Sequence, residues 1–323
     1  MKRFSFKLFL AFASCLSLSI SSRLVAQETV DNPIAAQANA DFAVQGEYAG
    51  SNFGLQVIAR GGGDFEIVTY AGGLPGEGWD RTPPTRVEGD ADTVAGIVKS
   101  KSLKRVDRKS PTLGATRPQG AIVLFDGTKE SLEKNWQSGA RITDDGLLMQ
   151  GATTKATFGD YTLHIEFRTP FQPKAEGQGR GNSGVYHQGR YETQVLDSFG
   201  LAGKNNETGG IYEIRDPDLN MCFPPLAWQT YDIDFTAPRF DATGKKTADA
   251  KLTVRLNGVT VQQDTPVLHA TRAAPLAEGN SPGPIHLQDH GNPVRYRNAY
   301  GSSNATRRSA ATDHSRCGPI RCG

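Results

Sequence analysis

One run of the sequence, Gly181–Asp197, holds most of the side chains that could do chemistry. Within it, Glu192 and Gln194 stand two residues apart in a segment that we expect to be a β-strand. Successive side chains of a strand point to opposite faces, so these two project from the same face, about 6–7 Å apart. A carboxylate held in this way can act as a general base.

With Asp197 included, the run resembles the Glu-x-Asp-x-x-Glu arrangement of some sandwich glycosidases, but Gln stands at the central position and Asp at the last. A retaining glycosidase needs two carboxyl groups about 5–5.5 Å apart. Glu192 and Gln194 do not supply that pair, so the pattern weakens the direct two-carboxylate mechanism. The alternative interpretation is a solvated polar face of a sheet that carries no chemistry.

A second polar cluster lies closer to the C-terminus, in Gly283–Asn292. His286, Gln288 and His290 alternate onto one face if this strand is regular. The two histidines are then too far apart for an ideal two-histidine metal site, which favours a base or a sugar contact. Histidines satisfied by ordinary hydrogen bonds are the alternative.

The elements that must position these clusters are mostly short strands. Asp160–Thr169 and Arg190–Leu196 alternate apolar and polar residues, which predicts sheets with one packed face. Lys251–Gln262 predicts a hairpin, because its Asn257-Gly258 pair accepts the positive φ angles of a tight turn. Only Lys129–Asn135 looks helical. The predicted fold class is therefore all-β, an antiparallel β-sandwich preceded by a small β domain.

Changes in composition divide the 323 residues into parts. We expect a signal peptide (1–26), a linker (27–40), a small N-terminal β domain (41–110), a second linker (111–118), the main β-sandwich (119–298) and a disordered or aberrant tail (299–323).

Strand patterns inside these parts are uneven. In the small domain, Gly54–Ala59 and Asp64–Tyr70 predict a strand pair, and Val94–Val106 predicts a few more short strands. The tail begins where the alternating pattern of Pro293–Asn298 stops abruptly. A frameshift that replaced the end of the last strand would explain the break, and a disordered terminus is the alternative.

The N-terminus predicts export. Basic residues precede a short apolar, Ser-rich stretch and a Leu24-Val25-Ala26 cleavage site, which is typical of a signal peptide. The apolar stretch is too short for a stable membrane span. A secreted or periplasmic protein is expected, and Cys15 leaves a lipoprotein open.

The rest of the chain limits its partners. Residues 27–298 are mildly acidic without a basic patch, which argues against nucleic acid as a partner. They contain one cysteine, Cys222, so neither a disulfide framework nor a cysteine zinc site is expected there.

Five motifs, in order, resemble the successive blocks of the 3-keto-disaccharide hydrolase family. They are Leu124–Gly127, Asn182–Tyr186, Gly189–Ser198, Trp228–Asp232 and Leu287–Gly291. Each is weak alone, but five in register are specific and span the main domain. The resemblance implies a concanavalin-like jelly roll that acts on sugars oxidised at C3.

The resemblance also implies a chemistry that needs no carboxylate nucleophile. A ketone at C3 acidifies the C2 proton, so one base can remove it and expel the C1 substituent, and water then adds to the enone. Glu192 is the expected base, with His187 or His290 as the acid. Further residues expected to bind substrate are Asn182, Arg190, Gln194, Asp197, Glu166, Arg168 and Gln288.

The enolate stabiliser and the class of protein stay open at this point. Arg190, Arg168 or a bound divalent cation could stabilise the enolate, and no metal ligands can be assigned from the sequence. A noncatalytic carbohydrate-binding module and a cell-surface structural module are the alternatives to an enzyme. Release of a leaving group from a 3-keto-glucoside would separate the enzyme from both.

Overall fold

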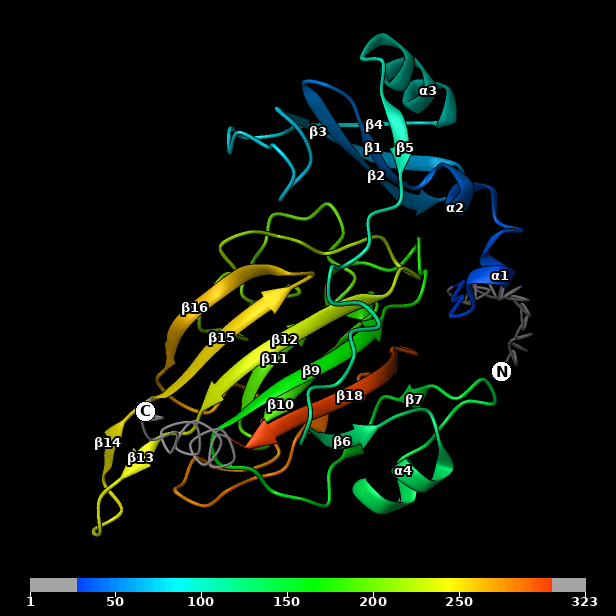
Figure 1. Cartoon of the computed structure of the whole chain (residues 1–323). Coiled ribbons are helices and arrows are strands. Elements are labelled where there is room, and N and C mark those ends of the chain that lie inside the picture. Colours follow the sequence, from blue (N-terminus) through cyan, green and yellow to red (C-terminus); the bar gives the residue numbers. More distant parts are fainter. Residues whose placement is uncertain (1–27, 304–323) are drawn as a thin grey trace, which may run out of the picture.

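The computed structural model describes residues 28–303, which form a five-stranded sheet and a two-sheet sandwich (Figure 1). The expected signal peptide (1–26) and the part of the expected tail from residue 304 onward lie outside the described residues. Within the described part, no helix has the length and apolar character needed to cross a membrane.

The N-terminal sheet is antiparallel, with the strand order β4-β3-β2-β1-β5. The predicted strand pair is its β2–β3 hairpin, and the turn glycines Gly61, Gly62 and Gly63 all have positive φ, a backbone that favours glycine. The strands are β1 (Gly46–Ala49), β2 (Phe53–Gly61), β3 (Asp64–Ala71), β4 (Thr85–Gly89) and β5 (Lys104–Val106).

A helix, α3 (Ala91–Ser100), corrects the prediction that Val94–Val106 forms only short strands. Asp90 caps its N-terminus with a side-chain hydrogen bond, which is a helix-start signal. Val94 is buried and Ile97 packs beside it, three residues on and therefore on the same helical face. The β-branched residues favour strands by propensity, but this spacing and the cap favour the helix.

The predicted linker at 27–40 is also partly helical. It contains α1 (Pro33–Ala36) and the start of α2 (Ala40–Val44). Asn32 and Asn39 precede these helices, and their side chains accept hydrogen bonds from first-turn amides. The segment before the first sheet is therefore ordered by local capping.

The main domain consists of two antiparallel sheets, which confirms the predicted all-β sandwich with a small β domain before it (Figure 1). The seven-stranded sheet has the order β16-β15-β12-β9-β18-β6, with β7 paired to β18, and the four-stranded sheet has the order β11-β10-β17-β8.

The strands of the seven-stranded sheet are β6 (Ile122–Phe125), β7 (Leu148–Met149), β9 (Tyr161–Arg168), β12 (Gln229–Thr236), β15 (Ala250–Leu256), β16 (Val259–Val267) and β18 (Arg295–Ser303). Those of the four-stranded sheet are β8 (Ala152–Thr153), β10 (Ser183–His187), β11 (Tyr191–Val195) and β17 (His286–Leu287). The remaining elements are α4 (Lys129–Asn135), as predicted, the 3₁₀ turn η1 (Gly177–Gly179) and the hairpin of β13 (Arg239–Phe240) and β14 (Lys246–Ala248).

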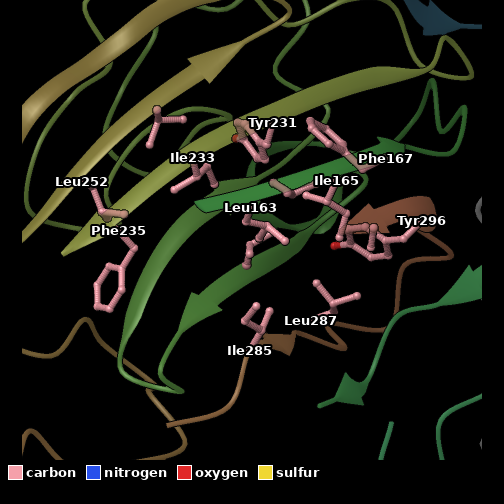
Figure 2. Packing of buried hydrophobic residues seen from close by; sticks show 14 of the residues in the cluster. Leu163, Ile165, Phe167, Tyr231, Ile233, Phe235, Leu252, Ile285, Leu287 and Tyr296 are labelled. Atoms are coloured by element: carbon pink, nitrogen blue, oxygen red, sulfur yellow. The ribbon is translucent and has the colours of Figure 1, made fainter. Parts of the chain in front are cut away.

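The core lies between the two sheets of the sandwich. Figure 2 shows Leu163, Ile165 and Phe167 of β9 facing Ile285 and Leu287 across it. These side chains are at most 2% exposed. The period-2 alternation of β9 thus places its apolar residues inside, as the sequence predicts, and leaves its polar residues on the outer face.

The last described strand does not stop at residue 298 as predicted. β18 continues to Ser303, and Ala299 and Tyr300 are buried. Its pairing with β9 shifts register between Arg297 and Tyr300, and Asn298 has a φ of 44°. This bulge breaks the apolar alternation in the sequence, because the extra residue changes which side chains face the core.

The residues expected as a second linker cross the outer face of the seven-stranded sheet. Thr112 Oγ1 donates a hydrogen bond to Asp232 at 2.7 Å, and the Gly114 amide donates one to Glu166 at 2.7 Å. We call residues 110–114 the strap. It ties the chain leaving the N-terminal sheet to the outer face of the sandwich.

Candidate active site

Strands β10 and β11 of the four-stranded sheet build the candidate site. Their register pairs Tyr186 with Glu192 and Gly184 with Gln194. Tyr191 and Val195 of β11 point into the hydrophobic core, so alternation directs Glu192 and Gln194 to the opposite face of the sheet.

A cavity of about 330 Å³ lies over this face. It contains a single carboxylate, several amides, two tyrosines, one arginine and one histidine among the described residues. Its lining is Gln178, Asn182, Tyr186, Glu192, Gln194, Tyr212, Arg272, Ala273, Gln288 and His290.

Glu192 is the carboxylate of the cavity, and its ionisation is strongly perturbed. It is 1% exposed, and burial raises the pKa of its carboxyl to about 8, although the neighbouring Tyr186 hydroxyl opposes the rise. Its Oε1 atom has no hydrogen-bond partner among the described residues. A buried acceptor without a partner is costly, so its place in a cavity indicates that a ligand completes it.

The peptide of Glu192 is held on both sides by loops. Its amide donates to Thr271 Oγ1 at 3.0 Å, and its carbonyl accepts from the Tyr212 amide at 3.2 Å. These bonds bring the loops around residues 212 and 272 to the cavity. The carboxylate therefore sits on an edge strand whose backbone is fixed by loop contacts.

Amide side chains form one wall of the cavity. Gln194 Nε2 donates to Gln178 Oε1 at 2.9 Å, and Asn182 Nδ2 donates to the Gln178 carbonyl at 2.8 Å. Asn182 Oδ1 is buried and, like Glu192 Oε1, has no partner among the described residues. The wall thus offers a fixed acceptor at the cavity without adding charge.

Half of the predicted site residues meet in this cavity: Asn182, Glu192, Gln194, Gln288 and His290. The structure places the other five elsewhere: His187, Arg190, Asp197, Glu166 and Arg168. Each of these has protein partners that account for its position.

His187 lies in the core behind the sheet, on the face of β10 opposite Tyr186. Its ring is fully buried, stacks on Phe235 and binds Tyr161 Oη at 2.6 Å and Thr193 Oγ1 at 3.0 Å. Burial lowers the pKa of His187 to about 3, so the ring is neutral. It does not line the cavity in which the structure places Glu192.

Arg190 and Asp197 flank β11 and bind other protein groups. Arg190 donates to the carbonyls of Ala277 and Ser281 at 2.7 and 2.9 Å, so it holds the loop that follows residue 271. Asp197 accepts from Arg180 Nε at 2.7 Å, and both side chains are buried. Both residues lie just beyond the strand, where period-2 reasoning no longer fixes the direction of a side chain.

Glu166 and Arg168 belong to β9 and face the outer side of the other sheet. Arg297, Asn298 and the Gly114 amide donate hydrogen bonds to Glu166. Burial would raise the pKa of its carboxyl, but these bonds and His164 lower it to about 2. Arg168 donates to the Asp31 carbonyl and lies 4.9 Å from the Trp228 ring centre.

A second cavity, of about 350 Å³, lies on that outer face. It is lined by the pair His164–Asp232, whose ring nitrogen and carboxylate are 2.6 Å apart, and by the residues after the strap. His164 already lies between Asp232 and Glu166. His164 and its two carboxylate neighbours therefore form an internal ion cluster. We place the candidate site in the other cavity, at Glu192.

Sequence reasoning missed Gln178, Tyr186, Tyr212, Arg272 and Ala273 as cavity residues. Tyr186 carried a usable signal, since it belongs to a family-like motif and lies opposite Glu192 in the hairpin. The others come from loops, and only long-range hydrogen bonds bring them to the cavity.

The described residues contain no group of three or more His, Cys, Asp or Glu side chains placed to hold a metal ion. The divalent cation that the sequence left open stays a prediction.

Comparisons with known proteins agree with the fold and the motifs. Residues 120–300 match the family of 3-keto-alpha-glucoside-1,2-lyase-like domains. A crystal structure from Parabacteroides distasonis, described as a candidate glycosyl hydrolase, shares 36% identity over 58% of this chain and 85% of its own, with a TM-score of 0.53. A second such protein of that organism shares 20% identity over 57% of this chain and 100% of its own, with a TM-score of 0.39.

No curated protein matches the chain. The family match covers more than half of the chain and includes all the motifs that carry the resemblance. This membership supports a carbohydrate-active enzyme of the glycosidase type. The chain belongs to the 3-keto-alpha-glucoside-1,2-lyase-like family, the one that its five motifs resemble.

Proposed function

We propose that the protein cleaves the glycosidic bond of 3-keto-glycosides, including 3-keto-disaccharides, by elimination followed by hydration. The observation that carries the proposal is Glu192, a lone buried carboxylate with a raised pKa and an unpartnered oxygen at a cavity. Family membership supplies the substrate class.

The cavity argues against ordinary two-carboxylate hydrolysis. Retaining and inverting glycosidases both need a pair of carboxyl groups, about 5–5.5 Å or about 6.5–9.5 Å apart. Among the described residues that line the cavity, Glu192 is the only carboxylate, and Gln194 stands where a second would be. An amide neither attacks the anomeric carbon nor acts as a general base.

Elimination requires only one strong base. Glu192 takes the C2 proton, and the electrons of the C2–H bond form the enolate of the C3 ketone. The enolate then re-forms the ketone and expels the C1 substituent, which takes a proton from His290 and leaves as an alcohol. Water adds across the C1–C2 double bond of the enone and gives the free 3-keto sugar.

The environment of Glu192 suits a base that removes a proton from carbon. Burial raises the pKa of the carboxyl to about 8, so its ionised form is a stronger base than an exposed glutamate. A base with a pKa close to the working pH combines an adequate ionised fraction with a high driving force for proton transfer.

The amides are suited to hydroxyl groups. Asn182 Oδ1 is free to accept a sugar hydroxyl, and Gln288 lies beside Tyr186 on the opposite wall. A wall of neutral donors and acceptors binds an uncharged sugar without the cost of burying an ion. This favours a neutral keto-glycoside as the substrate.

The test is release of p-nitrophenol from p-nitrophenyl 3-keto-α-glucoside, with the unoxidised glucoside as the matched substrate. We expect release only from the keto substrate and a loss of at least 100-fold in Glu192→Gln. The matched control is Glu278→Gln, since Glu278 binds Tyr191 Oη but lies outside the cavity. Binding without release would favour a carbohydrate-binding module. A protein that shows neither binding nor release would be a structural module.

We also propose export to the periplasm or the cell exterior, supported by the basic and apolar pattern of the first 26 residues. Mass spectrometry of the protein purified from its own host tests this. Cleavage after Ala26 is expected, and a cytoplasmic protein with an intact N-terminus would contradict it.

A further inference from the structure

Arg272 is the one permanent cation among the described residues that line the Glu192 cavity. Its Nη1 donates to Glu213 Oε1 at 3.0 Å, and the two side chains are 73% and 45% exposed. Neither residue carries a sequence signal for a site. The structure brings them together at the mouth of the cavity, although they lie on different loops.

Both loops are anchored on the peptide of Glu192. The Glu192 amide donates to Thr271, directly before Arg272, and the Glu192 carbonyl accepts from Tyr212, directly before Glu213. The ion pair is therefore positioned by the residue proposed as the base. A shift of the loop that carries Arg272 away from the cavity would disturb the bond to Thr271, while the Arg272 side chain stays free to turn.

The backbone at the ion pair is unusual. Glu213 has a φ of 54° and Ala273, next to Arg272, has a φ of 59°. Such left-handed conformations are unfavourable for residues other than glycine and often occur at functional sites. Each lies in a tight turn, closed by hydrogen bonds between Ile211 and Arg215 and from Ala274 to Thr271.

The ion pair is easily exchanged, because exposed pairs between arginine and glutamate contribute little in water. A negative charge that forms inside the cavity, on a substrate shielded from water, attracts a guanidinium more strongly than the exposed Glu213 does. The elimination creates such a charge on the C3 oxygen.

We propose that Arg272 is a catalytic residue that stabilises the enolate, and that Glu213 is the resting partner from which substrate takes it. The proposal rests on the proposed function. As Glu192 removes the C2 proton, the electron pair moves to the C3 oxygen, and an Arg272 N–H donates a hydrogen bond to that oxygen. When the C1 substituent leaves, the electrons return to form the enone, and Arg272 rebinds Glu213.

The test isolates enolate formation from bond cleavage. The probe is 3-keto-1,5-anhydroglucitol, a keto sugar without a glycosidic substituent at C1, whose C2–H exchange with D₂O is followed by NMR. We expect Arg272→Ala to slow exchange about 100-fold with little change in KM. Guanidinium ion should restore part of the rate to Arg272→Ala, and Arg272→Lys should keep more activity than the alanine variant.

The matched control is Arg239→Ala, which removes another exposed arginine from an ion pair, that with Asp160 at 2.6 Å. Its exchange and cleavage rates should equal those of the wild type. Glu213→Gln should raise kcat/KM severalfold at low ionic strength, since it removes the competitor for Arg272. An Arg272→Ala enzyme with wild-type exchange, or an unchanged Glu213→Gln enzyme, would overturn the inference.

The two proposals fail in different ways. If the wild type releases no leaving group from any 3-keto-glycoside, the proposed function is wrong. If the wild type cleaves and Arg272→Ala cleaves equally well, the function stands and only the role of Arg272 is wrong.

Discussion

Gly184 lies directly against the carboxylate of Glu192 on the neighbouring strand, and a Cβ atom at position 184 would overlap Glu192 Oε1. The Gly184 carbonyl also accepts a hydrogen bond from the backbone amide of Gln288 at 2.9 Å, so the backbone of Gly184 is fixed from the other side. The missing side chain is thus what leaves room for the buried carboxylate. This is a physical reason for the glycine at position 184 of the Asn182–Tyr186 motif.

Gly184→Ala should therefore impair catalysis more than folding. The new methyl group pushes the Glu192 carboxylate out of its position, and we expect kcat/KM for a 3-keto-glycoside to fall at least 10-fold. The comparison is Gly96→Ala in α3, where no atom lies near the added methyl and alanine favours the helix. Equal kcat/KM in the two variants would show that Glu192 needs no such space.

The pH dependence of cleavage should report the ionisation of Glu192. The base must be ionised to accept a proton, and burial raises the pKa of its carboxyl to about 8. We expect kcat/KM to rise about 10-fold per pH unit below that pKa and to level off above it. A rate that is already constant from pH 5 to 7 would mean that a different group is the base.

Period-2 alternation was enough to predict one part of the site. It placed Glu192 and Gln194 on one face of a strand, and the structure has both in one cavity. The same rule puts His187 on one face of its strand with the buried Val185, two residues before it. Alternation along β10 therefore places His187 in the core, together with Val185.

The rest of the site depends on contacts that a local pattern does not contain. Tyr212 and Arg272 reach the cavity only because their neighbours bind the peptide of Glu192. Similarly, the strand ending at Ser303 looked interrupted because a bulge at Asn298 shifts its register. The sequence pattern indicates strands such as β9 and β11, while long-range hydrogen bonds determine which loops meet them.

The two histidines proposed as the acid should behave differently. His290 lines the cavity and His187 does not, so His290→Gln should lower kcat for an alkyl 3-keto-glycoside about 100-fold. With p-nitrophenol, which leaves without a proton, the loss should be small. A similar loss with both leaving groups would assign His290 a role other than proton donation.

His187→Gln should act through stability. It disturbs the buried bond to Tyr161 Oη at 2.6 Å, and we expect a loss of about 1–3 kcal/mol in the free energy of unfolding. The folded fraction should keep the wild-type kcat, measured below the melting temperature. A fall in kcat without a fall in stability would return His187 to the catalytic residues.

Glu192→Gln should stabilise the protein while it abolishes turnover. Burial raises the pKa of the carboxyl from 4.5 to about 8 in the folded state, so the folded protein binds more protons than the unfolded chain between these values. Wild-type stability therefore falls as pH rises through this window, by on the order of 3–5 kcal/mol at most. The glutamine variant has no such loss. Its advantage in Tm over the wild type should be small near pH 4.5 and largest above pH 8.

The attachment of the strap should depend on the protonated form of His164. Burial alone would lower the pKa of His164, but its hydrogen bond to Asp232 and the nearby Glu166 carboxylate raise it to about 9. The protonated ring thus holds together the two carboxylates that accept hydrogen bonds from Thr112 and Gly114.

Because the folded pKa of His164 lies above the unfolded value near 6.5, its contribution is fully present below pH 6.5 and is lost as pH rises through about 9. We expect the wild type to exceed His164→Gln in stability by on the order of 1–3 kcal/mol at pH 6 and by little at pH 10. Denaturant unfolding across this range measures the difference, and limited proteolysis should cut the strap faster in the variant at pH 6. A difference in stability that does not change with pH would mean that His164 acts there by packing and not by charge, since the effect of Glu192 is the same in both proteins.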